Sequence, residues 1–347
     1  MRNLRANALV LAVCCSTALA GGLKTEQVAG DARWVAHVDV AAMLKSGLAQ
    51  FVLQEAEKKD SFLEGIANFR KTFGFDPLSD VRSLTLYGKE IGPEDGVVIL
   101  DATVNREKIL ALLTANETYK SHEYGDYVVH QWTDKPKAGA DGDAPVKEPK
   151  THFGCFYDEK TVLVASTLEL LKGEIDVLNG KSGSLAKSEA LKVLPKPLAG
   201  AFALAAAEGL KVSAGAKPQQ AALMRHVRDV AVQLGEAEGR TFLSITALAE
   251  TAQRAVKLRQ VIQGFVALWQ MTMAEKQDAP DLGETVEVSG EGNVVHVAAA
   301  APTKSLIEMI KFLAERKKEA AVRAARKKTA EVRQQLIKAR SRDRETG

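Results

Sequence analysis

One pattern occurs twice in the chain, and it constrains the fold more than any single motif does. The first copy has two apolar stretches, Val81–Gly88 and Gly96–Thr103, and the second has Val227–Gly235 and Gly239–Leu248. In each copy the two stretches are separated by a short glycine-bounded segment and followed by a run with helical periodicity. Both copies therefore predict strand, turn, strand and helix, and we interpret them as an internal duplication.

The short connections within each unit decide which kind of sheet is expected. The turns between the paired strands have fewer than ten residues, which is too short for the crossover that parallel strands need. The sequence therefore predicts an α+β fold with two tandem copies of a mainly antiparallel sheet and with helices on one face. A long basic helix is expected at the C-terminus, because the last residues are strong helix formers.

The domain boundaries follow from the same pattern, since 347 residues suffice for about two domains. The first repeat is predicted at 30–194 and the second at 195–314. The first repeat carries an additional hairpin, Tyr119–Trp132, and a flexible loop at 133–150 that is rich in Pro, Gly, Lys and Asp. Residues 315–347 are expected to form a solvated basic helical tail.

The first twenty residues have the pattern of a secretory signal peptide. Arg2 and Arg5 precede the apolar stretch Ala6–Val13, and Ala18-Leu19-Ala20 matches a cleavage site. We therefore expect residues 1–20 to be removed near Ala20. The mature chain is then expected in the periplasm or outside the cell.

The cysteines leave one alternative to simple cleavage. Lipidation of Cys14 or Cys15 would keep the mature chain anchored to a membrane. Val13 stands before Cys14, where a lipoprotein signal has a small residue, and this favours removal of both cysteines. Cys155 then remains alone, so an intramolecular disulfide is excluded. Its strand-like, aromatic surroundings favour a buried structural thiol over a catalytic nucleophile.

Charge is distributed unevenly along the chain. From Lys311 to Gly347 there are 13 Lys and Arg against 5 Asp and Glu, whereas the rest of the mature chain is acidic. The basic tail predicts peripheral contact with an anionic envelope surface. Nucleic acid is not expected as a partner, because the chain is exported and the basic residues lack interleaved aromatics. The expected contact residues are Lys317, Lys318, Arg323, Arg326, Lys327 and Lys328.

A transmembrane helix is not predicted in the mature chain. A membrane span needs ~18 uninterrupted apolar residues. The best candidate, Val261–Met273, is shorter and is interrupted by Gln263 and Gln270.

The most suggestive polar residues lie on the predicted strand Arg33–Val40. His37 and Asp39 share one face with Val35, and the opposite face, which is expected to be buried, carries only apolar residues. Together with His130, they are candidate metal ligands, or a base with its orienting carboxylate. The competing interpretation is a solvated sheet face, since close ligand spacing such as HExxH is absent from the sequence.

The duplication restricts such a site to the first half of the chain. At an offset of 166 residues, His37 and Asp39 align with Ala203 and Ala205, so a duplicated catalytic pair is excluded. The sequence also lacks G-x-S-x-G, Walker and GxGxxG motifs, and we predict neither a cofactor nor catalytic residues.

The opening Asp31–Val40 (DARWVAHVDV) follows a signal peptide and precedes a helix and the strand Val81–Gly88. This layout resembles that of a class of uncharacterised secreted bacterial proteins with an internally duplicated α+β unit. The resemblance extends over most of the mature chain, and it implies no activity, cofactor or catalytic residue.

These observations lead to three functional hypotheses. The first is an exported, non-enzymatic binding or structural protein of the periplasm or cell envelope, whose ligand or partner is an apolar molecule or another protein. The apolar stretch Val261–Met273 contributes to this expectation. The second is a metal-dependent hydrolase that uses His37, Asp39 and His130. The third is an adapter that docks on the envelope surface through the basic tail.

Overall fold

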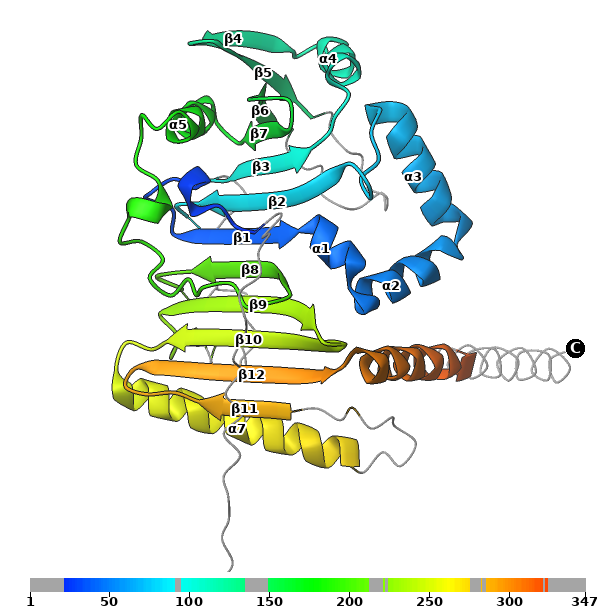
Figure 1. The fold of residues 1–347 in the computed structure, drawn as a ribbon, viewed down its shortest axis with the longest axis vertical. Coiled ribbons are helices and arrows are strands. Elements are labelled where there is room, and N and C mark those ends of the chain that lie inside the picture. The colour runs from blue at the N-terminus through cyan, green and yellow to red at the C-terminus, as the bar shows by residue number, and fades with distance from the viewer. Residues whose placement is uncertain are drawn as a thin grey trace, which may run out of the picture.

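The main feature of the computed structural model is one sheet of twelve strands, in which all neighbouring strands are antiparallel (Figure 1). The structure describes residues 22–90, 95–134, 149–211, 221, 224–274, 282, 285–320 and 322–323. The order across the sheet is β11-β12-β10-β9-β8-β1-β2-β3-β7-β6-β5-β4. The strands are β1 (Trp34–Asp39), β2 (Val81–Gly88), β3 (Val97–Ala102), β4 (Lys120–Tyr124), β5 (Tyr127–Thr133), β6 (Thr151–Phe156), β7 (Thr161–Ala165), β8 (Ala201–Ala207), β9 (Asp229–Ala237), β10 (Arg240–Leu248), β11 (Thr285–Ser289) and β12 (Val294–Pro302).

Helices occupy the longer connections between the strands. They are α1 (Val40–Lys45), α2 (Gly47–Glu57) and α3 (Asp60–Phe73) between β1 and β2, α4 (Arg106–Thr114) after β3, α5 (Leu168–Leu178) after β7 and α7 (Ala252–Ala274) after β10. Two short 3-10 helices are η1 (Thr25–Gln27) and η2 (Leu185–Lys187). A C-terminal helix follows β12 and includes residues 303–320, so it crosses the predicted boundary at 315.

The α+β class and the antiparallel sheet are confirmed, but the prediction that the helices lie on one face is wrong. Leu171 and Ile175 of α5 pack in the same core as Val35 of β1. Leu258 of α7 packs on the other face of the sheet. The strand registers place its core neighbours, Ala247 and Val295, on the face opposite to that of Val35. The physical reason is that many of the strands are apolar on both faces, so both faces need cover.

The strand β1 lies between β2 and β8 and joins the two halves of the chain into one sheet. In the register of β1 and β8, His37 is paired with Leu204. Strands β1–β7 lie on one side of this junction and β8–β12 on the other (Figure 1). The structure thus has a single continuous sheet across the predicted boundary at 194.

Several predicted elements are confirmed, and others, such as η1 and β11, were not assigned. The hairpin Tyr119–Trp132 corresponds to β4 and β5, joined at Gly125 and Asp126. Strand β11 was not predicted, because only five residues alternate between glycine-containing segments. The predicted signal peptide, residues 1–20, and most of the predicted loop at 133–150 lie outside the described residues.

Within the described part of the chain, no helix is long and apolar enough to cross a membrane. The stretch Val261–Met273, which was the best candidate in the sequence, forms the distal half of α7.

Candidate functional site

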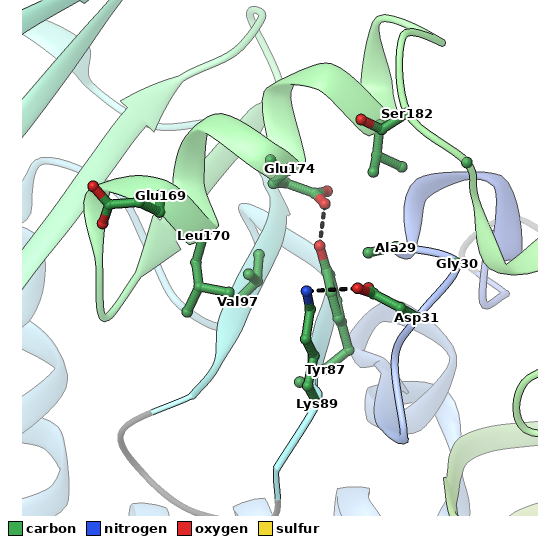
Figure 2. Close-up of a pocket in the computed structure, with 14 residues that line it drawn as sticks. Ala29, Gly30, Asp31, Tyr87, Lys89, Val97, Glu169, Leu170, Glu174 and Ser182 are labelled. Carbon is green, nitrogen blue, oxygen red and sulfur yellow. Dashed lines mark hydrogen bonds and ion pairs between the residues drawn. The ribbon is translucent and has the colours of Figure 1, made fainter.

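A pocket of about 500 Å³ lies between α5, the ends of β2 and β3, and the segment before β1 (Figure 2). The segment before β1 contributes Ala29–Asp31, and the two strands contribute Tyr87 and Val97. Helix α5 contributes residues from Glu169 to Val177, and the turn that follows it contributes Ser182 and Gly183. The volume is within the ordinary range for small-molecule sites.

Helix α5 places a carboxylate on its apolar side. The helix begins after Thr167, whose side chain accepts a hydrogen bond from the Leu170 amide at 3.2 Å. Leu171 and Ile175 are one turn apart and face the sheet, and Glu174 lies three residues after Leu171 on the same side. Glu174 is therefore buried, with 1% of its surface exposed.

Strand β2 supplies the partner of this carboxylate. Thr85 and Tyr87 are two residues apart and therefore share the face that α5 covers, and Tyr87 is 4% exposed. The Tyr87 hydroxyl donates a hydrogen bond to Oε2 of Glu174, as Figure 2 shows. The other oxygen, Oε1, is buried and has no hydrogen-bond partner among the described residues. Such an atom is unusual, because buried polar groups are almost always paired.

Burial changes the ionisation of both groups. It raises the pKa of Glu174 to about 7, although the hydrogen bond from Tyr87 opposes this rise. Burial also raises the pKa of Tyr87 well above its usual range, and the adjacent Glu174 carboxylate raises it further. Near neutral pH, Glu174 therefore exchanges between a neutral and a charged form, while Tyr87 stays a hydrogen-bond donor.

The rim of the pocket is acidic on balance. Lys89 Nζ lies 2.5 Å from Oδ2 of Asp31, and both side chains are largely exposed. Glu169 adds a second carboxylate at the rim. Because Lys89 is paired with Asp31, its charge is already compensated, and the remaining charge of the lining residues is negative.

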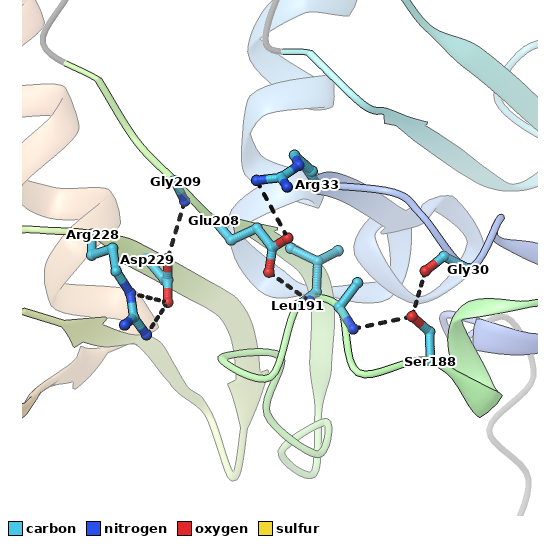
Figure 3. A network of polar contacts seen from close by, with 9 residues as sticks. Gly30, Arg33, Ser188, Leu191, Glu208, Gly209, Arg228 and Asp229 are labelled. Carbon is cyan, nitrogen blue, oxygen red and sulfur yellow. Dashed lines mark hydrogen bonds and ion pairs between the residues drawn. The ribbon is translucent and has the colours of Figure 1, made fainter. Parts of the chain in front are cut away.

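Contacts with the segment between α5 and β8 hold the wall formed by Ala29–Asp31 in place. The Gly30 amide donates to Gly183 O at 2.9 Å, and the Ser188 hydroxyl donates to Gly30 O. Figure 3 shows that the same network continues to Glu208, which accepts a hydrogen bond from the Leu191 amide at 3.0 Å and lies 4.0 Å from Arg33. The pocket is therefore preformed.

His37 and Asp39 lie on a covered face of the sheet, and their expected solvated setting is wrong. They are 5% and 7% exposed, whereas Trp34, Ala36 and Val38 on the opposite face are only half-buried. His37 Nδ1 lies 2.8 Å from Thr85 Oγ1. Asp39 Oδ1 accepts a hydrogen bond from the Ala42 amide at 2.8 Å, so Asp39 is the N-cap of α1.

His130 is remote from this pair. It lies on β5, which four strands separate from β1, so the distance is about 24 Å at ordinary strand spacing. The registers place Val129 on the face of His37, and His130 therefore points to the opposite face. Tyr119 Oη lies 3.0 Å from its Nδ1, and burial lowers the pKa of His130.

The structure thus does not bring the three candidate ligands together. Among the residues that it describes, no group of three or more His, Cys, Asp or Glu could hold a metal ion. Cys155 is buried, as expected, and burial raises its pKa to about 11, so the thiol stays protonated at neutral pH.

The Tyr87–Glu174 pair was not predicted. Glu174 occurs on the apolar stripe that Leu171, Ile175 and Leu178 form at helical spacing. This position is the one feature of the sequence that could have indicated a buried carboxylate. Its partner lies 87 residues earlier in the chain, at a contact that no local pattern reveals.

Comparisons with known proteins do not place the chain in a family. No family model matches the chain, and no curated protein matches it. Among solved structures, crystal form III of TP0453 is similar with a TM-score of 0.41 and 7% identity, covering 82% of this chain and 96% of that one. Crystal form I of TP0453 has a TM-score of 0.38 and 7% identity, covering 83% and 96%. Similarity at this level carries no argument about function.

The raised pKa of Glu174 predicts a pH-dependent stability. At pH values between the unfolded pKa of 4.5 and the folded pKa of about 7, Glu174 takes up a proton when the wild type folds. The stability that this proton contributes is lost as pH rises through about 7. The Glu174→Gln variant has no such proton. The free energy of unfolding of the variant, relative to that of the wild type, should therefore rise by about 2.5 kcal/mol from pH 5 to pH 8, as measured by urea unfolding.

The matched control is Glu159→Gln, because Glu159 is exposed in the turn between β6 and β7. This variant should follow the wild type at both pH values. If Glu174→Gln and the wild type show the same pH dependence, Glu174 does not have a raised pKa.

Proposed function

We propose that the chain is an exported, non-enzymatic binding protein of the periplasm or cell envelope, and that its ligand occupies the Tyr87–Glu174 pocket. The observation that carries this proposal is that Glu174 lines the pocket and that its buried Oε1 has no partner among the described residues. A buried carboxylate oxygen is costly to leave unpaired, and a ligand that supplies a donor removes that cost.

Export is supported by the pattern of residues 1–20 and by the role of the segment that follows. Directly after the expected cleavage near Ala20, Leu23 packs against the core and Val28 is buried within it. The proposed mature N-terminus is therefore part of the fold that forms the pocket wall.

We also infer that the sheet consists of two tandem copies of one unit, related about the β1–β8 junction. Outward from the junction, the order β1-β2-β3-β7-β6 matches β8-β9-β10-β12-β11. Gly88 ends β2 and Gly235 lies two residues before the end of its proposed counterpart β9, and a Cβ at either position would lie within 2.5 Å of another atom.

The alignment that the structure favours differs by one residue from the sequence alignment at an offset of 166. Ala203 pairs with Val38 and therefore lies on the other face from His37, whereas Leu204 pairs with His37. At an offset of 167, the burial patterns of β1 and β8 coincide, and His37 is opposite its own proposed counterpart. The polar pair remains specific to the first copy, since Leu204 and Ala206 replace it.

Gly173 offers a direct test of the pocket. It lies on α5 and lines the pocket, and an added Cβ would meet no atom within 4 Å. Gly173→Leu should therefore fold normally and fill the pocket, because leucine favours a helix. Native mass spectrometry of the exported protein is expected to show a bound small molecule on the wild type and its loss from this variant.

The control is Gly65→Leu, since Gly65 is also an open helical position but lies on α3. This variant should retain the bound molecule. A wild-type protein that carries no small molecule after gentle purification, or a molecule retained by Gly173→Leu, would contradict the proposed site.

A second candidate function is peripheral contact with the envelope surface. The distal half of α7, residues 261–274, contains no charged residue, yet Phe265, Leu268 and Met271 are strongly exposed. The C-terminal helix carries Lys317 and Lys318 on its exposed surface, and Arg323 is exposed as well. The other residues expected to make this contact, Arg326, Lys327 and Lys328, lie outside the described residues. An apolar segment together with a basic helix favours an anionic bilayer surface.

Vesicle sedimentation tests this second function. The wild type should bind vesicles that contain phosphatidylglycerol at low salt and should be released at about 0.5 M salt, where charge attraction is screened. Truncation after Arg316 should abolish the salt-sensitive binding. A truncated protein that sediments like the wild type would show that the tail has no such role.

A further inference from the structure

The lining of the pocket combines a buried carboxylate with apolar walls and an excess of negative charge. The Glu174 carboxylate points from α5 toward the Tyr87 hydroxyl (Figure 2). The apolar walls come from Val97, Leu170 and Val177. Among the described residues of the lining, the single lysine is paired with Asp31, so it offers no free charge to an anion.

We propose that the pocket binds a small organic cation, in which an ammonium group with at least one N–H is attached to an apolar body. The N–H donates to Oε1 of Glu174, the atom that lacks a partner among the described residues. The apolar body lies against Val97, Leu170 and Val177. This inference rests on the proposed function, since it names the ligand class of the same pocket.

The chemistry of the site favours an ammonium ion over the alternatives. A hydrogen bond between an ammonium and a carboxylate is charge-assisted and is stronger than one between neutral groups. A bare metal cation suits the pocket less well, because calcium takes six to eight oxygen ligands and the buried part of the lining has one carboxylate. An anion would meet Glu174 and Glu169 without a free cation among the described lining residues to balance them.

Binding of an ammonium ion is coupled to the ionisation of Glu174. Tyr87 already donates to Oε2, so Oε1 accepts from the ligand when the carboxylate is charged. The pKa of Glu174 is about 7 in the free protein because the group is buried, and ligand binding should lower it. The other ionisable groups near Glu174 are Tyr157 after β6, the Asp31–Lys89 pair of the rim, and Glu169 on its own helix.

Isothermal titration calorimetry with hexylammonium, hexanol and hexanoate tests the proposal. Hexylammonium should bind the wild type, and its affinity should rise by about 50-fold from pH 5 to pH 7, because Glu174 must lose a proton. Heats measured in two buffers should show release of nearly one proton at pH 5 and almost none at pH 8.5. Glu174→Gln should abolish binding, since a neutral amide has no negative charge to balance the buried cation, and Glu159→Gln should bind as the wild type does.

Each other outcome overturns the ligand class. If hexanol binds as tightly as hexylammonium, or if Glu174→Gln retains hexylammonium binding, the pocket binds apolar bodies without selecting a cation, and the proposed binding function survives. If the three probes fail to bind while native mass spectrometry finds a molecule that Gly173→Leu loses, the ligand class is wrong and the site is right. If both experiments fail, the proposed function is wrong as well.

Discussion

The pairing of β1 with β8 is the interaction on which the rest of the structure depends. It joins strands that are 167 residues apart where His37 meets Leu204, and it converts two separate sets of strands into one sheet. Without it, β1 and β8 would each be an edge strand with a row of unpaired backbone groups. The linker between α5 and β8, residues 179–200, leads to this junction and also holds the Ala29–Asp31 wall through Gly30 and Ser188.

A buried polar side chain in each half of the chain has its hydrogen bonds satisfied to a different extent. In the second half, Gln233 of β9 is buried, but its Oε1 accepts from the Leu198 amide at 2.9 Å and its Nε2 donates to Lys196 O at 3.4 Å. The linker thus satisfies both ends of this side chain. In the first half, Tyr87 satisfies one oxygen of Glu174 and leaves the other without a partner among the described residues. Because Glu174 also lines a pocket, we locate the function in the first half.

The strand pairs and the turns between them were predictable because glycine-bounded apolar stretches are local signals, as at Val81–Gly88 and Val227–Gly235. The face assignment of β1 failed because it assumed that a polar face is a solvated one. The segment before β1 and the linker cover that face, and Thr85 supplies a partner for His37. The site itself could not be predicted from the sequence, because Tyr87 and Glu174 come into contact only when β2 and α5 pack together.

The central claim is that Glu174 is a buried carboxylate that binds a cationic ligand. The most direct test of this claim is the titration of the Glu174 carboxyl group itself. Carbon-13 NMR of the side-chain carboxyl group can follow its ionisation in the free protein and at saturating hexylammonium. The account predicts that Glu174 titrates with a pKa of about 7 in the free protein and that the ligand lowers this value by at least about three units, which is about 4 kcal/mol of coupling. Titration near 4.5 in the free protein, or a pKa that hexylammonium leaves unchanged, would contradict it.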